Sequence, residues 1–245
     1  MVDAYETTDG YSVRLVDGVW TAEGSRVFDP AKPYENRDPR LRMTICVNEE
    51  TGWPTWNETP IYTYQGGANG QPLNGGTPTG YYLKKYCQGD IDLRSNSTNK
   101  SAYHTWITYR LGEFYLNYAE AEFQLGHEDV AREYVNKVRA RKSVNMPSIT
   151  DSGEALLKRI YHERQIELAF EGHRFFDLRR WKIADNTPIV GLNIIKDGEG
   201  KFSYERYVLS LDSRKNEWKD AFFVLPIHYS EIQKSNESLE QNNGY

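Results

Sequence analysis

The sequence predicts a mainly α-helical fold, in which tetratricopeptide-like helix pairs are covered by a long loop-rich segment with a few short strands. Residues 106–183 predict the helix pairs, because apolar side chains recur there at spacings of three and four. Residues 1–105 predict the covering segment, because short apolar stretches alternate with clusters of glycine, proline, asparagine and aspartate. Residues 184–245 are expected to form an irregular C-terminal segment of the same domain.

Within the loop-rich segment, residues 11–16 and 43–47 alternate apolar and polar side chains and predict brief strands. Turn-forming sequences lie between them, at residues 29–33 and 36–40. Residues 65–80 contain six glycines and two prolines, so they predict a long loop of the kind that often carries function.

The first predicted helix begins at about residue 103 and ends at Gly126, and the second begins at Glu128. Acidic residues open the second helix, where the helix dipole is positive. Arg139 and Arg141 lie with two lysines near its other end, and we expect them to match the negative end of the dipole.

This pair of helices is similar to one tetratricopeptide repeat. The pattern sets Ala119 of the first helix against Ala131 of the second at a tight crossing, and puts Gly126 in the turn. The usual tryptophan and terminal proline of the repeat are missing. Since a solenoid is normally stable only with several stacked repeats, we expect missing neighbours or a long covering segment.

A third helix is predicted over residues 153–171, and a shorter aromatic helix follows it to close a second pair. Residues 162–181 mix large aromatic side chains with many charges, so some charges must be paired close to the core. We interpret this stretch as a structural clamp of arginine–carboxylate pairs.

A metal-dependent hydrolase is the catalytic alternative for this stretch, with His162, Glu163, Glu167 or His173 as its residues. The zinc-protease pattern needs a second histidine four residues after the first, and that position is Ile166. We therefore predict no catalytic residue, no metal site and no cofactor.

Composition excludes several classes of protein. The formal net charge of −5 and the pI near 5.6 argue against a nucleic-acid-binding surface. No apolar run approaches a membrane span, and the first residues lack the basic start and apolar core of a signal peptide. Cys46 and Cys87 are too few for a disulfide framework and lack metal-site spacing.

Five ordered motifs and the C-terminal sequence together resemble the C-terminal half of the SusD/RagB family. The motifs are Val2-Asp-Ala-Tyr5 with Asp9-Gly10; Asp29-Pro30 with Asn36-Arg-Asp-Pro-Arg-Leu41; Thr79-Gly-Tyr-Tyr-Leu-Lys-Lys85; Arg110-Leu-Gly-Glu-Phe-Tyr-Leu-Asn-Tyr-Ala-Glu-Ala121; and Arg164 through Trp181. The ending is Leu225-Pro-Ile227, Ser230-Glu-Ile232, then Gln241-Asn with Gly244-Tyr245. His228 stands where the family often has a proline.

The resemblance implies a surface-exposed lipoprotein of the outer membrane that binds oligosaccharides or polysaccharides without catalysis. It would deliver them to a TonB-dependent transporter of the SusC type for nutrient uptake, as part of polysaccharide utilisation. The family usually begins with a lipoprotein signal, an anchoring cysteine and further helices. We therefore expect this chain to be the C-terminal half of a longer protein, with membrane contact only through a lipid anchor that the chain lacks.

A sugar-binding site should combine exposed aromatic faces, on which sugar rings stack, with polar side chains on loops. Trp53 and Trp56 fit best, because they flank a proline outside any helical stripe with Asn57 next to them. Tyr62 and Tyr64 follow at strand spacing, so both would point to one face.

Two interpretations compete with that site. The two tryptophans could instead fill a gap beneath the loop layer, and Trp106, Trp181 and Trp218 are expected to be packing residues. For the chain as a whole, the alternative function is a helical-repeat scaffold that binds a protein partner and no sugar.

Overall fold

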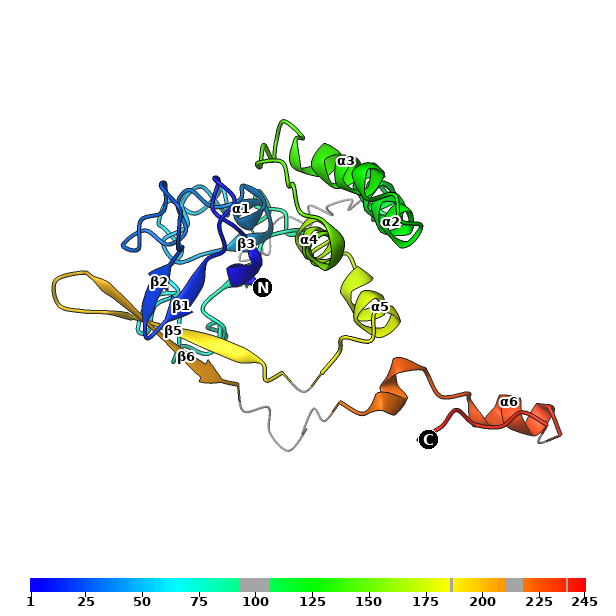
Figure 1. The fold of residues 1–245 in the computed structure, drawn as a ribbon. Coiled ribbons are helices and arrows are strands. Elements are labelled where there is room, and N and C mark those ends of the chain that lie inside the picture. Colours follow the sequence, from blue (N-terminus) through cyan, green and yellow to red (C-terminus); the bar gives the residue numbers. More distant parts are fainter. Residues whose placement is uncertain (93–105, 186, 210–217, 237) are drawn as a thin grey trace. The chain divides into compact units, whose positions relative to one another are not determined.

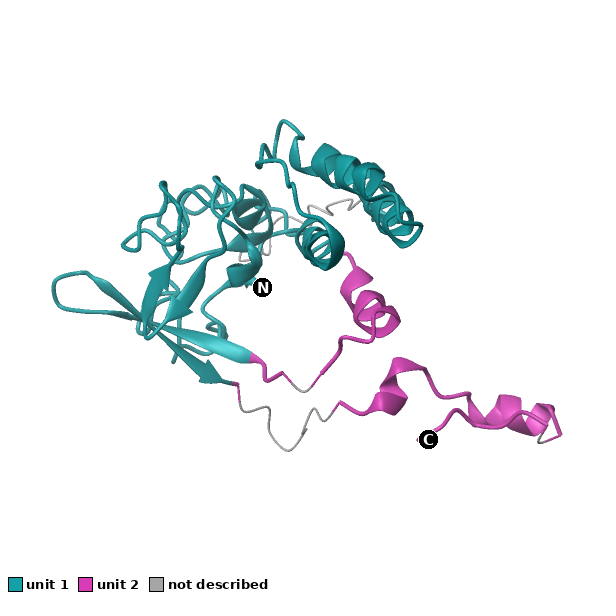
Figure 2. Cartoon of the chain, viewed as in Figure 1, with its two compact units in different colours: residues 1–169, 190–208 teal, residues 170–189, 209–245 magenta. Residues whose placement is uncertain are grey.

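The computed structural model describes residues 1–92, 106–185, 187–209, 218–236 and 238–245 (Figure 1). They form two compact units, residues 1–169 with 190–208 and residues 170–189 with 209–245 (Figure 2). Residues 93–105, the end of the predicted loop-rich segment, lie outside the described ranges, and the predicted division of the chain at 105 and 183 stays a prediction. Within the described ranges, no helix is both long and apolar enough to cross a membrane.

Three long helices of the first unit confirm the predicted helical region: α2 (Leu111–Gln124), α3 (Glu128–Arg139) and α4 (Gly153–Glu167). A short connection joins α2 to α3, and the two helices lie side by side (Figure 1). Gly126 has a φ of +83° in this connection, which glycine adopts without strain. Helix α4 ends at Glu167 rather than at residue 171, and Phe170 then takes a left-handed φ of +62°.

The apolar stripes of the three helices form one core. Ala119 and Ala131 are both fully buried in it, as expected for the small residues of a helix pair. The buried residues of this core are Leu116, Ala119, Ala131, Val135, Val138, Ile149, Leu156 and Ile160.

The covering segment contributes a short helix, α1 (Arg40–Thr44), and four short strands. Strands β1 (Arg14–Val16) and β2 (Val19–Thr21) pair antiparallel, as do β3 (Ile45–Cys46) and β4 (Tyr82–Leu83). The brief strands predicted at 11–16 and 43–47 are thus present in shortened form.

A β-hairpin lies where the sequence predicted an irregular segment. Strands β5 (Val190–Lys196) and β6 (Phe202–Val208) pair antiparallel along their full length, from Val190 opposite Val208 to Lys196 opposite Phe202. Asp197 organises the turn, since its carboxylate accepts hydrogen bonds from the backbone of Glu199 and Lys201.

Two further cores join the covering segment to the rest of the first unit. One unites the N-terminal residues with α1, β3 and α4, through Val2, Tyr5, Tyr34, Leu41, Ile45, Val47 and Ile166. The other unites the β1–β2 pair with the β5–β6 hairpin, through Val13, Trp20, Leu192, Ile194 and Tyr204. The loop-rich segment therefore covers α4 with its own apolar side chains.

The second unit holds α5 (His173–Arg180), a 3₁₀ turn at Asp220–Phe223 and α6 (Tyr229–Lys234). Helix α5 follows Gly172, whose φ of +84° is a left-handed conformation that glycine adopts without strain. Trp218 packs against Phe223 with ring centroids 5.0 Å apart, as predicted for a packing residue. Because α4 and α5 belong to different units, their pairing as a second repeat stays a prediction.

Candidate functional site

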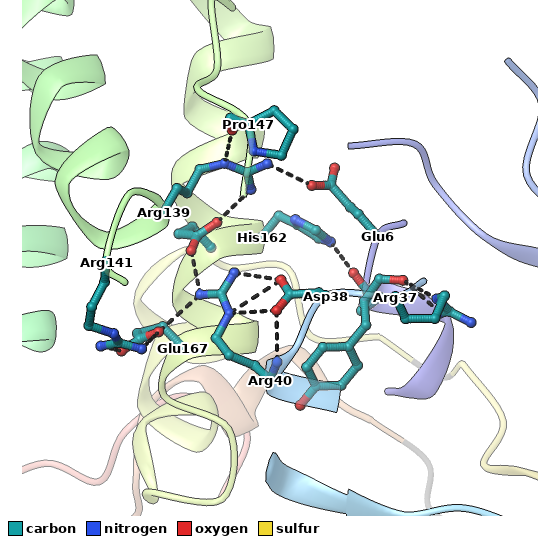
Figure 3. A network of polar contacts seen from close by, with 12 residues as sticks. Glu6, Arg37, Asp38, Arg40, Arg139, Arg141, Pro147, His162 and Glu167 are labelled. Atoms are coloured by element: carbon teal, nitrogen blue, oxygen red, sulfur yellow. Dashed lines mark hydrogen bonds and ion pairs between the residues drawn. The ribbon is translucent and has the colours of Figure 1, made fainter. Parts of the chain in front are cut away.

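A buried cluster of ion pairs lies where the covering segment meets α3 and α4 (Figure 3). This buried ion cluster consists of the buried residues Glu6, Asp38, Arg40, Arg139, Glu163 and Glu167, together with the partly exposed Arg110, Arg141 and Arg159. Its members come from the N-terminal segment, from α1, α3 and α4, and from residues that flank α1, α2 and α3, so the cluster joins distant parts of the sequence.

Arg40 is the cation at the centre of the cluster. Its Nη2 lies 2.7 Å from Asp38 Oδ2, and its Nη1 lies 2.5 Å from Glu163 Oε1 and 2.9 Å from Glu167 Oε2. Burial opposes its charge, but Glu163 and Asp38 outweigh burial and raise the pKa of Arg40 above its ordinary value. The guanidinium is therefore permanently charged and held by three carboxylates.

Arg139 extends the cluster from α3 to the N-terminal segment. It donates through Nη1 to Glu163 Oε2 and through Nη2 to Glu6 Oε2, both at 3.0 Å, and through Nε to the backbone carbonyl of Pro147 at 2.7 Å. Arg159 on α4 also pairs with Glu6.

Glu167 closes the cluster at the end of α4. Arg110 Nη1 lies 2.6 Å and Arg141 Nη1 2.7 Å from its Oε1, and Arg40 approaches its other oxygen. Burial raises the pKa of Glu167, but the hydrogen bonds from Arg141 and Arg110 and the charge of Arg40 outweigh it and lower the pKa to about 2.

The carboxylates of the predicted clamp are present in α4, and the arginines that pair with them lie outside residues 162–181. Arg139 lies in the last turn of α3, as its expected match to the helix dipole requires, and it is also buried and pairs with two carboxylates. Arg141 likewise pairs with Glu167. The charge pattern of a helix end alone cannot distinguish a solvated arginine from one that meets a distant buried carboxylate.

His162 has a structural contact in the same region. Its Nε2 lies 2.7 Å from the backbone carbonyl of Ala4, so this nitrogen donates, and the ring ties α4 to the N-terminal 3₁₀ turn at Val2–Ala4. Neighbouring Glu163 is fully engaged by two arginines. Among the described residues, no group of three or more histidine, cysteine, aspartate or glutamate side chains could hold a metal ion.

The candidate sugar-binding residues lie in a different part of the first unit. Trp53 and Trp56 occupy a loop outside any helix or strand, and both side chains are half-buried. The loop rests on residues 84–91: the Trp53 ring faces Lys84 Nζ, 5.9 Å from the ring centroid, and Trp56 Nε1 donates to the Ile91 carbonyl at 2.8 Å. Each tryptophan is thus contacted by residues 84–91 and keeps part of its side chain exposed to solvent.

Asn57 stabilises its own turn. Its Nδ2 donates to the backbone carbonyl of Thr59 at 2.8 Å, and its Oδ1 lies 3.3 Å from the Thr59 hydroxyl. The side chain is half-buried, so a ligand would have to compete with or add to these local bonds.

Tyr62 and Tyr64 contact one another edge to face, with ring centroids 5.7 Å apart. Tyr64 also lies 5.8 Å from the Phe202 ring, and Lys196 Nζ lies 5.2 Å from the Tyr64 centroid. Tyr64 therefore packs on the β5–β6 hairpin, and the structure shows two supported aromatic groups: the tryptophans on residues 84–91, and the tyrosines beside the hairpin. Whether these five residues bind sugar stays a prediction.

Trp106 is more exposed than the sequence predicted. Trp106 was expected to be a packing residue, but 70% of it is exposed. The helix that was predicted to begin at about residue 103 begins at Leu111, so Trp106 precedes α2 and does not pack within it.

The chain matches known proteins along its whole length. The family model described as the SusD family matches residues 1–245. SusD-like protein P25 of Formosa agariphila is 32% identical over 170 residues, which make up 67% of this chain and 29% of that protein.

Two crystal structures from Bacteroides fragilis are also similar. A SusD-like protein is 29% identical with a TM-score of 0.76, over 100% of this chain and 46% of that one. A SusD-like carbohydrate-binding protein is 25% identical with a TM-score of 0.69, over 95% of this chain and 46% of that one. This chain therefore spans less than half the length of these relatives.

Proposed function

The chain belongs to the SusD family, and on that premise we propose that it binds oligosaccharides or polysaccharides at the cell surface without altering them. The observation that carries the proposal is the likeness, along 95% of the chain, to a protein described as a SusD-like carbohydrate-binding protein. A protein of this kind would sit on the outer membrane as a lipoprotein and pass its ligand to a SusC-type TonB-dependent transporter for nutrient uptake.

The loop at Trp53, Trp56 and Asn57, with Tyr62 and Tyr64, is the proposed binding surface. Its support comes from chemistry: sugar rings present flat CH faces to aromatic planes, and hydroxyl groups bond to amides. Half-buried tryptophans held by a second segment are pre-ordered, so little side-chain entropy is lost on binding.

The test replaces Trp53 and Trp56 with alanine, singly, in the full-length protein. Native gels containing laminarin, arabinoxylan, galactomannan or soluble starch would measure retardation, with Tyr229→Ala as the control because Tyr229 is exposed on α6. We expect each tryptophan variant to migrate faster than the parent in the gel that retards the parent, at unchanged mobility in plain gels. Equal retardation of parent and variants would remove the two residues from the site, and a parent that no polysaccharide retards would contradict the function.

Delivery to a transporter has its own test. Co-purification of the full-length protein with a SusC-type transporter encoded by a neighbouring gene is the expected result, and a neighbourhood without such a gene would contradict that part of the proposal.

A protein-binding scaffold remains the second candidate, because α2 has an exposed apolar face formed by Leu111, Phe114, Tyr118 and Leu125. These residues lie on one side of the helix, because they are three, four and seven positions apart in the sequence. Absence of glycan binding together with stable capture of one defined protein partner, lost in Phe114→Glu, would favour this candidate.

A further inference from the structure

A second aromatic surface lies in the first unit, where the exposed ring of Trp106 is backed by the ring of Tyr86. Trp106 stacks on Tyr86 with ring centroids 5.5 Å apart and an interplanar angle of 20°. With 70% of Trp106 exposed, most of the indole surface faces water. Burying a large aromatic side chain is normally favourable, so a stacked tryptophan held at the surface needs an explanation.

The surrounding residues hold this stack in place. Tyr86 has a φ of +65°, a left-handed conformation that is costly for a residue with a large side chain. Lys85 donates through Nζ to the backbone carbonyl of Ala169 at 2.9 Å, and its Nζ lies 5.9 Å from the centroid of the Tyr86 ring. These contacts fix the base of the stack to the residues just after α4, so the ring pair is a built feature of the surface.

The same segment supports the two tryptophans of the proposed site. Lys84, next to Lys85, lies over Trp53, and a Cβ added to Gly89 would come within 2.6 Å of the Trp53 ring. Trp56 bonds to the carbonyl of Ile91. Residues 84–91 therefore carry the Trp106 stack at Tyr86 and contact the Trp53 loop at Lys84, Gly89 and Ile91.

We propose that the stack of Trp106 on Tyr86 is a second stacking subsite, which takes a pyranose ring of the same polysaccharide chain. This inference rests on the proposed function and extends it from one aromatic platform to two. The Lys85 ammonium is already engaged by the Ala169 carbonyl, so recognition at this subsite depends on the flat apolar face of the sugar rather than on a negative charge.

When one polysaccharide chain can reach two subsites, binding at the first raises the effective concentration of the chain at the second. A polymer that reaches both platforms gains the second contact as an intramolecular step, whereas a short oligosaccharide occupies only one. Loss of Trp106 should therefore weaken the binding of long chains and leave the binding of short ones unchanged.

The experiment compares Trp106→Ala with Tyr109→Ala in the full-length protein. Tyr109 is a matched control, because it is an aromatic residue of the same segment with the same 70% exposure, but its ring meets Phe114 at a 45° tilt rather than in a near-parallel stack. The first probe is the polysaccharide that retards the parent most in native gels, chosen from laminarin, arabinoxylan, galactomannan and soluble starch. The second probe is the disaccharide repeat of that polysaccharide. Calorimetry measures the binding of each probe.

We expect Trp106→Ala to weaken polysaccharide binding about fivefold, the size of one aromatic contact of about 1 kcal/mol, with disaccharide binding unchanged. Trp106→Phe should recover part of the loss, and Tyr109→Ala should bind both probes as the parent does. Parent-like polysaccharide binding by Trp106→Ala, while Trp53→Ala still weakens it, would overturn the second subsite alone. A parent that binds no polysaccharide in the panel would overturn the proposed function and this inference together.

Discussion

At the scale of single residues, Glu163 is the carboxylate that two buried arginines share. One oxygen lies 2.5 Å from Arg40 and the other 3.0 Å from Arg139, and only 1% of the side chain is exposed. A buried ion is costly unless it is paired and hydrogen-bonded, so removing one member of the cluster should destabilise the folded state strongly.

Replacing Glu163 with glutamine should therefore be severe. The amide keeps the size of the side chain but leaves two guanidiniums short of one negative charge, and we expect a loss of about 3–5 kcal/mol in the free energy of unfolding, measured by urea denaturation. Glu154→Gln is the matched control on the same helix: its carboxylate is 78% exposed and pairs with Lys158 at the surface, where solvent screens the pair, so the loss should be far smaller. Similar losses in both variants would show that the cluster does not carry this energy.

The sequence indicated only part of this cluster, the charged stretch that holds Glu163 and Glu167, and neither Glu6 nor Asp38 nor the partner arginines. The crowding of charge in residues 162–181 indicated that some of these charges must be paired near the core. Arg40 and Arg139 could not be assigned as their partners, because those contacts join positions 123 and 24 residues away from Glu163. Trp53 and Trp56 could be predicted as loop residues because the proline between them and the lack of helical spacing are local features of the sequence. Their support by residues 84–91 is a non-local contact and could not be predicted in this way.

At the scale of elements, the periodicity of apolar residues located the helices but not the β5–β6 hairpin. A three- and four-residue spacing repeats over several turns in α2, α3 and α4, so the signal accumulates. The hairpin offers only a short alternation and the turn at Asp197-Gly198, a pair that favours tight turns. Charged and glycine residues around it gave the appearance of an irregular segment.

Gly80 links this hairpin to the covering segment. It has a φ of +79°, and a Cβ added there would come within 2.8 Å of the backbone carbonyl of Leu192 on β5. A backbone atom cannot move aside as the end of a flexible side chain can, so only glycine fits this approach.

We therefore expect Gly80→Ala to destabilise the protein more than Gly52→Ala. Gly52 has a similar φ of +72°, but a Cβ there would meet nothing within 4 Å, so its substitution adds only the conformational cost of about 1 kcal/mol. Gly80→Ala adds a steric conflict of about 1–3 kcal/mol to that cost. Urea denaturation would measure the difference, and hydrogen exchange should show faster opening of β5; equal losses in the two variants would contradict this account of the docking.

At the scale of the whole molecule, the loop-rich segment supplies the cover that a short helical repeat lacks. A pair of helices in a solenoid normally buries its faces against further repeats. In the first unit, Tyr5, Leu41 and Val47 bury Ile166 of α4 instead, and the buried ion cluster joins the same segment to α3 and α4 (Figure 3). Cover and helices are therefore expected to unfold together.

The cluster also makes the stability of the first unit depend on pH, with a sign set by Glu167. Its pKa is about 2 in the folded protein against an ordinary value of 4.5, so the folded state binds fewer protons than the unfolded state between these values. The stabilisation is fully present above about pH 5 and is lost as the pH falls toward 2. The difference between the two pKa values of Glu167 corresponds to about 3 kcal/mol of folding stability.

Glu167→Gln should flatten this acid dependence. The variant is expected to be less stable than the parent at pH 7, because Arg40, Arg110 and Arg141 lose their shared carboxylate. Between pH 5 and pH 3 it should lose less further stability than the parent, because the titrating group is gone. Urea midpoints at pH 7, 5, 4 and 3 would measure both curves, with Glu154→Gln expected to keep the slope of the parent. Parallel curves for Glu167→Gln and the parent would show that other carboxylates control the acid unfolding of the first unit.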